Sequence, residues 1–351
     1  MCQKVTLFVM ESDRNMTILV TGGAGYIGSH TVLYLKEKGE SVVVLDNLIT
    51  GHRQSVLNNI PFYMGSLHDE ELLHYICQNH NIEAIIHFAA NSLVGESVKE
   101  PLSYYENNVS GTLSLLKVMN KNNIKKLVFS STAAVYGEPK HVPIQEEDHA
   151  IPTNPYGETK LAIEKMLHWA EKAYGIKSVS LRYFNAAGAD PEGRIGEEHH
   201  PETHLIPIVL QTALGQRNKI NVFGDDYPTP DGTCIRDYVH VMDLADAHYC
   251  ALEKIRNENE GGVYNLGNGK GFSVKEVIET CREVTQREIK VETSPRRPGD
   301  PAVLVASSQK ARDELKWLPK HPDLKDIITH AWNYHAKQSH QNKKRNVQFV
   351  K

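Results

Sequence analysis

Tyr156 and Lys160 stand four positions apart in a segment of helical pattern, so their side chains share one helix face. A tyrosine phenol has a pKa near 10 and is a poor base at neutral pH. Lowering that pKa to about 7 takes about 4 kcal/mol of preferential stabilisation of the phenolate, which a nearby lysine and a positively charged ligand could supply. An ordinary surface tyrosine and lysine have the same spacing, so the pair indicates proton transfer only in a suitable context.

That context comes from Ser130–Thr132, which ends a predicted strand. Hydroxyl groups there emerge at the carboxyl edge of a parallel sheet, where ligands of such folds bind. Thr132 could then hydrogen-bond the substrate oxygen whose proton Tyr156 removes. We therefore predict Tyr156, Lys160 and Thr132 as the catalytic residues.

A glycine-rich segment, Gly22–Gly28, follows the predicted strand Thr17–Val20 and fits G-x-G-x-x-G at 23, 25 and 28 and G-x-x-G-x-x-G at 22, 25 and 28. Glycines let the backbone approach a pyrophosphate, whose charge a helix N-terminus stabilises. Asp46, 18 residues after Gly28, can bond ribose hydroxyls and repels a 2′-phosphate. The pattern predicts NAD rather than NADP, although a glycine turn without a ligand and a turn that Asp46 caps with Asn47 are the alternatives.

The segment Glu197–His204 imitates a metal-binding motif. Its order is His-Pro-Glu-x-His rather than His-Glu-x-x-His, and Pro201 disfavours a helical conformation at His200, so we predict no metal site. The cysteines form no C-x-x-C pair, which predicts reduced, mostly structural thiols. They are Cys2, Cys77, Cys234, Cys250 and Cys281.

Alternating strands and helices must position these groups in the first half of the chain. The predicted strands are Thr17–Val20, Ser41–Leu45, Phe62–Met64, Ala84–Phe88, Leu127–Ser130 and Ser178–Tyr183, and the predicted helices are Ile27–Lys38, Glu70–Gln78, Tyr104–Asn120 and Tyr156–Tyr174. The unbroken apolar run Val42–Leu45 is typical of a parallel strand covered on both faces. This alternation predicts a Rossmann-type, doubly wound parallel α/β sheet.

The regular alternation of predicted strands and helices ends after Asn185. Helices are expected near Leu205–Leu214, Val241–Glu253, Ser273–Val284 and Leu324–His335, and strands near Ile220–Phe223 and Val263–Leu266. Ser273 and Glu276 form a capping-box signal. We predict an NAD-binding domain at 16–185, a smaller mixed α/β substrate lobe at 186–337 with some elements interleaved into the first domain, and terminal extensions at 1–15 and 338–351.

Composition limits the possible partners. The 351 residues suffice for about two folding units, and 39 basic against 43 acidic residues give a net charge of −4, with no electrostatic reason to expect a nucleic acid. No apolar run approaches the roughly 18 residues of a membrane span. Val5–Met10 is too short for a signal peptide, so we expect a cytoplasmic protein without a membrane partner.

Thr21–Gly28, Ser130–Thr132 and Tyr156–Lys160 together resemble the extended short-chain dehydrogenase/reductase family. Further motifs sharpen the resemblance toward its UDP-glucose 4-epimerases, of the kind found in Bacillus-like bacteria. These motifs are His87–Ala90, Val94–Ser97, Asn107–Val109, Arg182–Asn185, Asp231–Tyr238 and Pro295–Asp300. The resemblance spans about Met16 to His335.

The resemblance implies tightly bound NAD. Its contacts would come from Gly22, Gly25, Tyr26, Ile27, Gly28, Asp46, Asn47, Ser66, Leu67, Phe88, Ala89, Ala90, Ser92, Asn107, Thr132, Tyr156, Lys160 and Phe184. Many relatives have Gly-Asp where this chain has Gly65-Ser66, so adenine binding is expected to rest on Leu67 or water. Ser92 replaces a lysine of some members, which removes a direct charge on the cofactor.

The resemblance likewise implies a UDP-hexose substrate. Its contacts would come from Asn185, His204, Leu205, Asn221, Phe223, Arg236, Arg297 and Asp300. Guanidinium groups grip a diphosphate bidentately, although either arginine alone could be a surface ion pair. Leu304 stands at the gate beside the sugar 2-substituent; leucine is intermediate in size there, so acceptance of UDP-N-acetylhexosamines stays open.

The implied reaction interconverts UDP-galactose and UDP-glucose at C4 through a 4-keto intermediate, in galactose metabolism and the supply of UDP-galactose for surface polysaccharide. A homodimer is implied, through the Tyr104–Asn120 and Tyr156–Tyr174 helices. A 4,6-dehydratase of the same fold would need an acid directly after Thr132, where this chain has Ala133-Ala134. A catalytically silent dinucleotide sensor is an alternative of a different class. Such a protein could dispense with the tyrosine and lysine, whereas this chain retains both.

Overall fold

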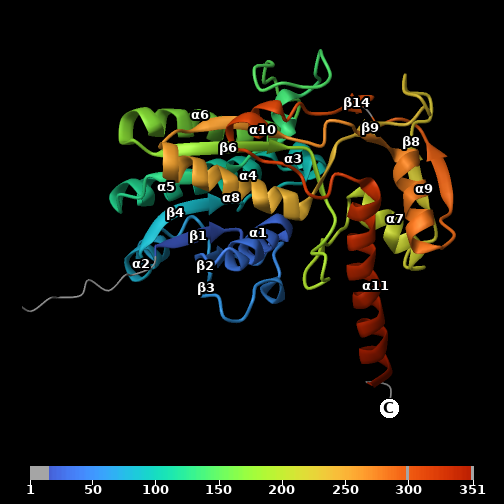
Figure 1. Cartoon of the computed structure of the whole chain (residues 1–351), viewed down its shortest axis with the longest axis horizontal. Coiled ribbons are helices and arrows are strands. Elements are labelled where there is room, and N and C mark those ends of the chain that lie inside the picture. The colour runs from blue at the N-terminus through green and yellow to red at the C-terminus, as the bar shows by residue number, and fades with distance from the viewer. Residues whose placement is uncertain (1–15, 298–299, 349–351) are drawn as a thin grey trace, which may run out of the picture.

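The structure, a computed structural model, describes residues 16–297 and 300–348. Within them, seven parallel strands form one sheet in the order β3-β2-β1-β4-β5-β6-β11 (Figure 1). The strands are β1 Thr17–Thr21, β2 Ser41–Asp46, β3 Phe62–Met64, β4 Ile82–His87, β5 Lys126–Ser130, β6 Lys177–Tyr183 and β11 Gly262–Leu266. The strand order runs outward from β1 in both directions, which confirms the predicted Rossmann-type sheet.

Each face of this sheet has its own apolar core, because successive side chains of a strand point to opposite faces. Ile18 and Val20 of β1 join the core beneath α1 Tyr26–Glu37 and α8 Val241–Glu258. Leu19 joins the core on the other face, beneath the helices α2 Glu70–Asn79, α5 Gly111–Lys121 and α6 Pro155–Tyr174. Burial on both faces explains the unbroken apolar runs of the strands.

The predicted helix Tyr104–Asn120 is not one regular helix. The structure has α4 Pro101–Tyr104, then a π-helix at Tyr105–Ser110, then α5, and α3 Val94–Lys99 precedes them where no helix was predicted. A π-helical turn inserts an extra residue into the helical repeat and often marks a functional site. Apolar periodicity could not detect it, since the chain stays helical on either side.

The C-terminal half builds a further apolar core between α7 Leu205–Ala213, α9 Val274–Thr285 and α11 Leu324–Gln348. Short strands flank it: β7 Asn185–Ala187 pairs with β10 Tyr238–His240, β8 Ile220–Phe223 with β13 Val291–Ser294, and β9 Ile235–Arg236 with β12 Phe272–Ser273 and β14 Val303–Leu304. The remaining elements are α10 Gln309–Glu314 and 3₁₀ turns at Arg53–Ser55 and Ala133–Tyr136.

Two details of this half bear on the sequence predictions. The capping box of Ser273 and Glu276 is present at the start of α9. Helix α11 continues to Gln348, beyond the predicted end near His335, so the stretch from 338 to 348 is helical rather than an irregular tail. The extension 1–15, the Pro298–Gly299 part of a quoted motif and residues 349–351 lie outside the described residues.

Across residues 16–297 and 300–348, no helix combines the length and the apolar character that a membrane crossing requires.

Candidate active site

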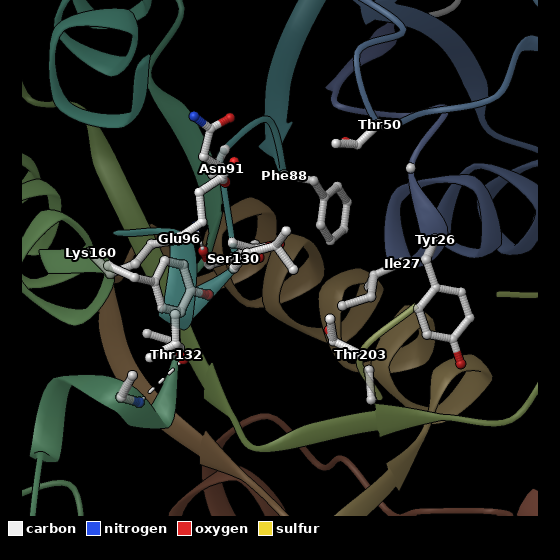
Figure 2. A pocket seen from close by; sticks show the side chains of 18 of the residues that line it. Tyr26, Ile27, Thr50, Phe88, Asn91, Glu96, Ser130, Thr132, Lys160 and Thr203 are labelled. Atoms are coloured by element: carbon white, nitrogen blue, oxygen red, sulfur yellow. Dashed lines mark hydrogen bonds between the residues drawn. The ribbon is translucent and has the colours of Figure 1, made fainter. Parts of the chain in front are cut away.

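One cleft of about 1400 Å³ opens at the carboxyl ends of the central strands. It begins where β1 and β4 lie side by side while their connections leave in opposite directions, the position at which ligands bind in open α/β sheets. Figure 2 shows Tyr26, Ile27 and Thr203 on one side of the hollow and Thr132, Ser130 and Lys160 on the other, with Phe88 between them. Both halves of the chain therefore contribute to one site.

The glycine-rich loop has room for a dinucleotide. A Cβ at Gly22, where φ is +74°, would lie 2.5 Å from the Ala89 nitrogen, and a Cβ at Gly28 would lie 2.1 Å from the Gly22 oxygen. Packing thus requires these two glycines. A Cβ at Gly25 would come no closer than 3.4 Å to any of its neighbours, the Gly22 oxygen being the nearest. The bare space at the N-terminus of α1 is what a pyrophosphate would fill.

Asp46 performs the turn role that we weighed as an alternative. Its carboxylate accepts the Ala24 amide (2.9 Å) and the Leu48 amide (2.8 Å), so it fixes the loops after β1 and β2. Asp46 also lines the cleft together with Asn47. The two roles are compatible, because each carboxylate oxygen has a second lone pair.

Helix α6 places the predicted proton-transfer pair. Asn154 caps the helix through the Gly157 amide (2.9 Å), and Pro155 occupies its first turn. The Lys160 ammonium donates to the Ser130 carbonyl at 2.8 Å and lies 5.9 Å from the centroid of the Tyr156 ring. Lysine and tyrosine thus face the cleft together beside the end of β5, as predicted from their spacing.

Desolvation governs the charge of both groups. It raises the pKa of Tyr156, and a hydrogen bond with Thr132 opposes this rise. Burial lowers the pKa of Lys160 to about 7, against the influence of Glu164. The protein by itself therefore favours a neutral phenol and weakens the charge on the amine. A bound cation near Tyr156 would stabilise the phenolate and make this residue a better base.

Asn108, which received no role from the sequence, connects the cleft loop to the catalytic helix. Its Oδ1 accepts the Asn91 amide at 2.8 Å, and its Nδ2 donates to the Asn91 carbonyl and to Thr159 Oγ1, each at 3.1 Å. Asn108 is fully buried within the π-helix. The irregular turn thus has a physical function: it holds the loop after β4 against α6.

Two arginines, Arg236 and Arg297, also line the cleft. Arg236 on β9 forms an ion pair with Asp300, and both side chains line the cleft rather than the outer surface. The Arg297 guanidinium lies 4.1 Å from the centroid of the Phe223 ring. Leu304 on β14 pairs with Arg236 across the sheet and also lines the cleft.

Of the predicted site residues, all but three line this cleft. Leu205 begins α7 directly after His204, and Asn221 and Phe223 lie on β8, outside the lining. Lining residues without a predicted role include Asn91, Glu96, Lys99, Glu197, His199 and Thr203. Glu96 lies in the motif Val94–Ser97, on which the family resemblance rests. Glu197 and His199 belong to the segment Glu197–His204, for which we predicted no metal site.

The Rossmann sheet, the glycine cradle and the tyrosine–lysine pair within one cleft define a nucleotide-binding enzyme of the short-chain dehydrogenase/reductase class. The sequence profile of the NAD dependent epimerase/dehydratase family matches residues 18–267, and the chain belongs to that family.

Individual proteins similar to this chain are UDP-glucose 4-epimerases. The UDP-glucose 4-epimerase of Halalkalibacterium halodurans is 65% identical over 325 residues, which cover 93% of this chain and 97% of the relative. A crystal structure of a UDP-glucose 4-epimerase is 58% identical and superposes with a TM-score of 0.91, covering 92% of this chain and 98% of that one. The Bifidobacterium longum UDP-glucose 4-epimerase, solved in complex with NAD+ and UDP, is 41% identical with a TM-score of 0.86, covering 92% of this chain and 98% of that one.

Proposed function

We propose that this chain is an NAD-dependent isomerase that interconverts UDP-galactose and UDP-glucose at C4 of the hexose. The observation that supports this most directly is that one cleft is lined by the glycine cradle, by Tyr156 and Lys160, and by Arg236. A dinucleotide and a nucleotide sugar would therefore meet at the phenol. The names of the relatives agree with this assignment.

Each residue of the central group has a defined task. Tyr156 accepts the proton of the 4-hydroxyl and later returns it, while Thr132 hydrogen-bonds the same oxygen. Lys160, fixed by the Ser130 carbonyl, holds the cofactor ribose and supports the phenolate. Bound in the glycine cradle, NAD+ would supply a hydride acceptor that is restored in each turnover. Ala133 and Ala134 also line the cleft and provide no acid for a dehydratase elimination.

Inversion requires that the hexose present its other face before the hydride returns. This is possible if the diphosphate is anchored and the sugar is held loosely. Arg236 and Arg297 supply the anchor, since a guanidinium grips a diphosphate bidentately. Substrate arrival would then exchange the Asp300 partner of Arg236 for a phosphate oxygen.

The test is to incubate the purified chain with UDP-galactose without added NAD and to measure UDP-glucose. We expect conversion, because the cofactor should remain bound through purification. If no product forms even with NAD supplied, the proposal is wrong. The Tyr156→Phe variant should lose at least about 100-fold in turnover, in line with the usual contribution of general acid–base catalysis.

The sugar range depends on Leu304, which lines the cleft beside Phe184 in a small apolar cluster. The same assay with UDP-N-acetylglucosamine, on the wild type and on Leu304→Ala, tests this gate. A gain for the N-acetylated sugar in the variant alone would assign the restriction to leucine.

We also propose that the first domain, 16–185, holds NAD while 186–337 holds the UDP-sugar, and that the enzyme works as a cytoplasmic homodimer. Cys77, Cys234, Cys250 and Cys281 are free thiols, a state typical of a reducing compartment. The helices expected at the dimer interface carry exposed apolar side chains, among them Leu113 and Trp169, and Leu102 lies just before the first of them.

A further inference from the structure

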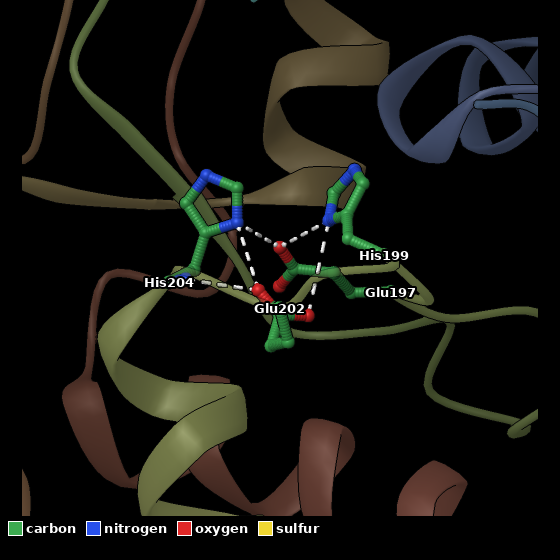
Figure 3. Close-up of side chains that lie close together, drawn as sticks. All are labelled: Glu197, His199, Glu202 and His204. Carbon is green, nitrogen blue, oxygen red and sulfur yellow. Dashed lines mark hydrogen bonds and ion pairs between the residues drawn. The ribbon is translucent and has the colours of Figure 1, made fainter. Parts of the chain in front are cut away.

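Four side chains outside the proton-transfer group converge on one point of the cleft wall. They are Glu197, His199, Glu202 and His204, and Figure 3 shows their polar ends turned toward one another. One potential ligand atom from each lies within 4.8 Å of all the others. This is not the His200–His204 pair that we weighed from the sequence: His200 is exposed and lies outside the cluster.

The distances suit a shared ligand. Glu197 Oε1 lies 2.8 Å from His204 Nδ1 and 3.2 Å from His199 Nδ1. Glu202 approaches the same nitrogens, at 3.2 Å from His204 and 3.9 Å from His199. Two imidazole nitrogens and two carboxylate oxygens around Zn²⁺, at about 2.0–2.2 Å from the metal, would stand about 3.3–3.6 Å apart. Small side-chain movements would bring the observed distances between the ligand atoms to those expected around Zn²⁺.

Two buried atoms in the cluster have no hydrogen-bond partner of acceptable geometry: Glu197 Oε1 and His199 Nδ1. Glu197 is only 3% exposed. Glu197 Oε1 therefore depends on its ion pairs with the two histidines and has no well-aligned hydrogen bond. A buried carboxylate without good hydrogen bonds is costly, and coordination of a cation would lower that cost.

Charge supports the same conclusion. Among the described residues, Glu197 and Glu202 form ion pairs only with the two histidines, and no lysine or arginine side chain is paired with either carboxylate. Two carboxylates buried side by side require a positive charge between them. Against the effect of desolvation, their proximity raises the pKa of His204 to about 10, so an imidazolium supplies this charge without metal, and a bound cation would take its place. Glu202 is also oriented from behind, since its Oε1 accepts the amides of Thr203 (2.8 Å) and His204 (2.9 Å). Such outer contacts are typical of metal ligands.

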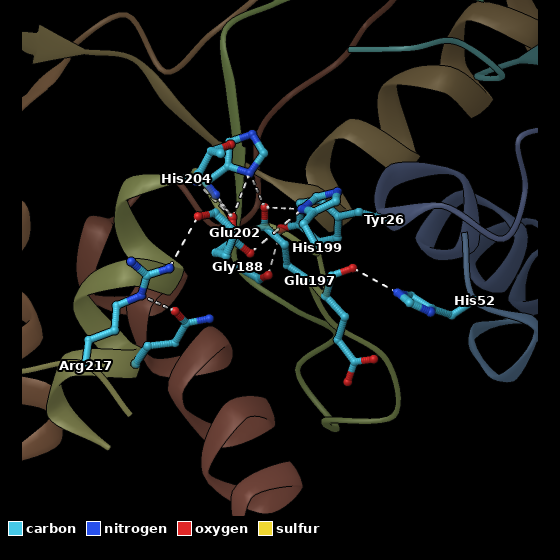
Figure 4. Close-up of polar contacts among 11 residues, drawn as sticks. Tyr26, His52, Gly188, Glu197, His199, Glu202, His204 and Arg217 are labelled. Atoms are coloured by element: carbon cyan, nitrogen blue, oxygen red, sulfur yellow. Dashed lines mark hydrogen bonds and ion pairs between the residues drawn. The ribbon is translucent and has the colours of Figure 1, made fainter. Parts of the chain in front are cut away.

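Hydrogen bonds connect the segment around the cluster to the first half of the chain (Figure 4). The Tyr26 hydroxyl donates to the Gly188 carbonyl at 2.7 Å, and His52 Nε2 pairs with the Glu198 carbonyl at 3.0 Å. These contacts join the loop that contains the cluster to the first helix and the loop after β2. The side chain of His204 is 47% exposed toward the cleft, which leaves an entry path.

We propose that Glu197, His199, Glu202 and His204 bind one Zn²⁺ ion, which fixes the loop 188–204 as a wall of the cleft. This replaces our sequence prediction of no metal site. The mixed imidazole and carboxylate set suits a divalent transition metal rather than Ca²⁺ or Mg²⁺. His204, predicted as a substrate contact, is then a metal ligand at the edge of the substrate site.

The test uses the untagged full chain, stripped with a chelator, reloaded with ZnCl₂ and desalted. We expect about one Zn²⁺ per chain by mass spectrometry of the metal, a higher unfolding midpoint, and the visible spectrum of tetrahedral coordination with Co²⁺ in place of zinc. Glu197→Gln, which keeps the side-chain shape, should weaken Zn²⁺ binding by more than about 100-fold, more than loss of an outer contact would.

The matched control is His200→Gln, next to the cluster but outside it, which should bind Zn²⁺ as the wild type does. Less than about 0.1 Zn²⁺ per wild-type chain, with an unchanged unfolding midpoint, would overturn the proposal and leave a closed network of histidines and carboxylates. Equal Zn²⁺ binding by wild type and Glu197→Gln would overturn it too, by placing the ion elsewhere. These readouts do not depend on turnover, so they are independent of the proposed reaction.

Discussion

The pKa values of Tyr156 and Lys160 are shifted in opposite directions by the same physical cause, burial. Removal from water disfavours a charged side chain, so the pKa of the phenol rises and the pKa of the ammonium falls to about 7. Below pH 7 Lys160 is mainly charged, and above it mainly neutral, in the protein without cofactor. The chemistry therefore depends on a ligand that brings positive charge into the cleft.

This dependence gives a spectroscopic prediction. Without cofactor, Tyr156 should ionise only above pH 10, because desolvation outweighs the Thr132 hydrogen bond. With NAD+ bound, the ionisation should move below pH 10. The measurement is the phenolate absorbance of the wild type minus that of Tyr156→Phe across a pH titration, with and without NAD+. Identical titrations in the two states would show that the cofactor charge does not act on Tyr156.

Gly25 and Gly28 make a second prediction at the scale of the residue. The Cβ of Gly25→Ala has room against the protein, at 3.4 Å from the nearest atom, so unfolding free energy should change by less than about 1 kcal/mol. Its methyl group would occupy the place of the pyrophosphate, and bound NAD should fall at least about 10-fold. NAD content after purification and a urea unfolding curve measure the two effects.

Gly28→Ala is the matched control. Its Cβ would meet the Gly22 oxygen at 2.1 Å, so it should lower both stability and NAD content. Full NAD content in Gly25→Ala would contradict the placement of the pyrophosphate.

Residues whose type and local spacing together indicate a role could be identified from the sequence. Glycines at fixed offsets, an acid after the second strand and a tyrosine four residues from a lysine form patterns within one local segment. The partners of Asn108 could not be read, since Asn91 and Thr159 are brought to it by the fold. Nor could the convergence of Glu197 with His204, which depends on how a loop of irregular backbone folds back on itself.

At the scale of the element, a buried charge network ties the central strands to α6. Arg182 on β6 pairs with Glu164 on α6, and both are at most 9% exposed. Arg182 also donates to the Tyr136 hydroxyl, which donates to Asn265 on β11. The network thus joins two strands and a helix, and the charge of Glu164 also opposes the fall of the Lys160 pKa.

Removing one partner should cost far more than removing both. Arg182→Met leaves a buried carboxylate without its cation, which should destabilise the fold by about 3–5 kcal/mol. The double variant Arg182→Met with Glu164→Leu should recover about half of that loss or more. Urea unfolding of the three proteins measures this difference. Equal losses in the single and double variants would instead assign the stabilisation to the individual hydrogen bonds.

Helices were predictable where the apolar periodicity extends over several turns, and strands where an apolar run extends over a whole buried strand. The central strands and α1, α2 and α6 belong to this group, with ends that differ by one or two residues. The π-helix was not predictable, because the contacts made by Asn108 within it are with residues distant in the sequence. Two-residue strands such as β9 and β14 carry too little pattern to be recognised, and only their pairing defines them.

At the scale of the molecule, the two halves of the sequence do not separate cleanly in space. Helix α8 covers the same sheet face as α1, and β11 forms one edge of the sheet, although both follow residue 185. A fragment ending there would expose apolar core that α8 covers, including the environment of Ile18 and Val20. The predicted interleaving follows from one requirement: a single cleft must receive groups from both halves.

The last prediction concerns assembly. Leu102 is 81% exposed and Trp169 is 65% exposed, on α4 and α6, two helices that contact each other. Val98, Tyr105 and Leu113 on the neighbouring helices are exposed as well. A monomer rarely presents so many large apolar side chains on adjacent helices, and burial against a second copy would remove them from water. The chain of 39.5 kDa should therefore elute at about twice that mass in size-exclusion chromatography with light scattering.

Leu102→Asp should shift this equilibrium toward the 39.5 kDa monomer, with a dissociation constant at least about 10-fold higher, because a carboxylate would be buried in the apolar contact. Leu318→Asp is the control: Leu318 is 63% exposed, and its neighbour Trp317 packs into the core on the sheet face opposite to α6, so the variant should remain dimeric. The glycine cradle and Tyr156 lie within one chain, so the monomer should retain NAD. A monomeric wild type, or a dimer that both variants leave intact, would place the contact elsewhere or exclude it.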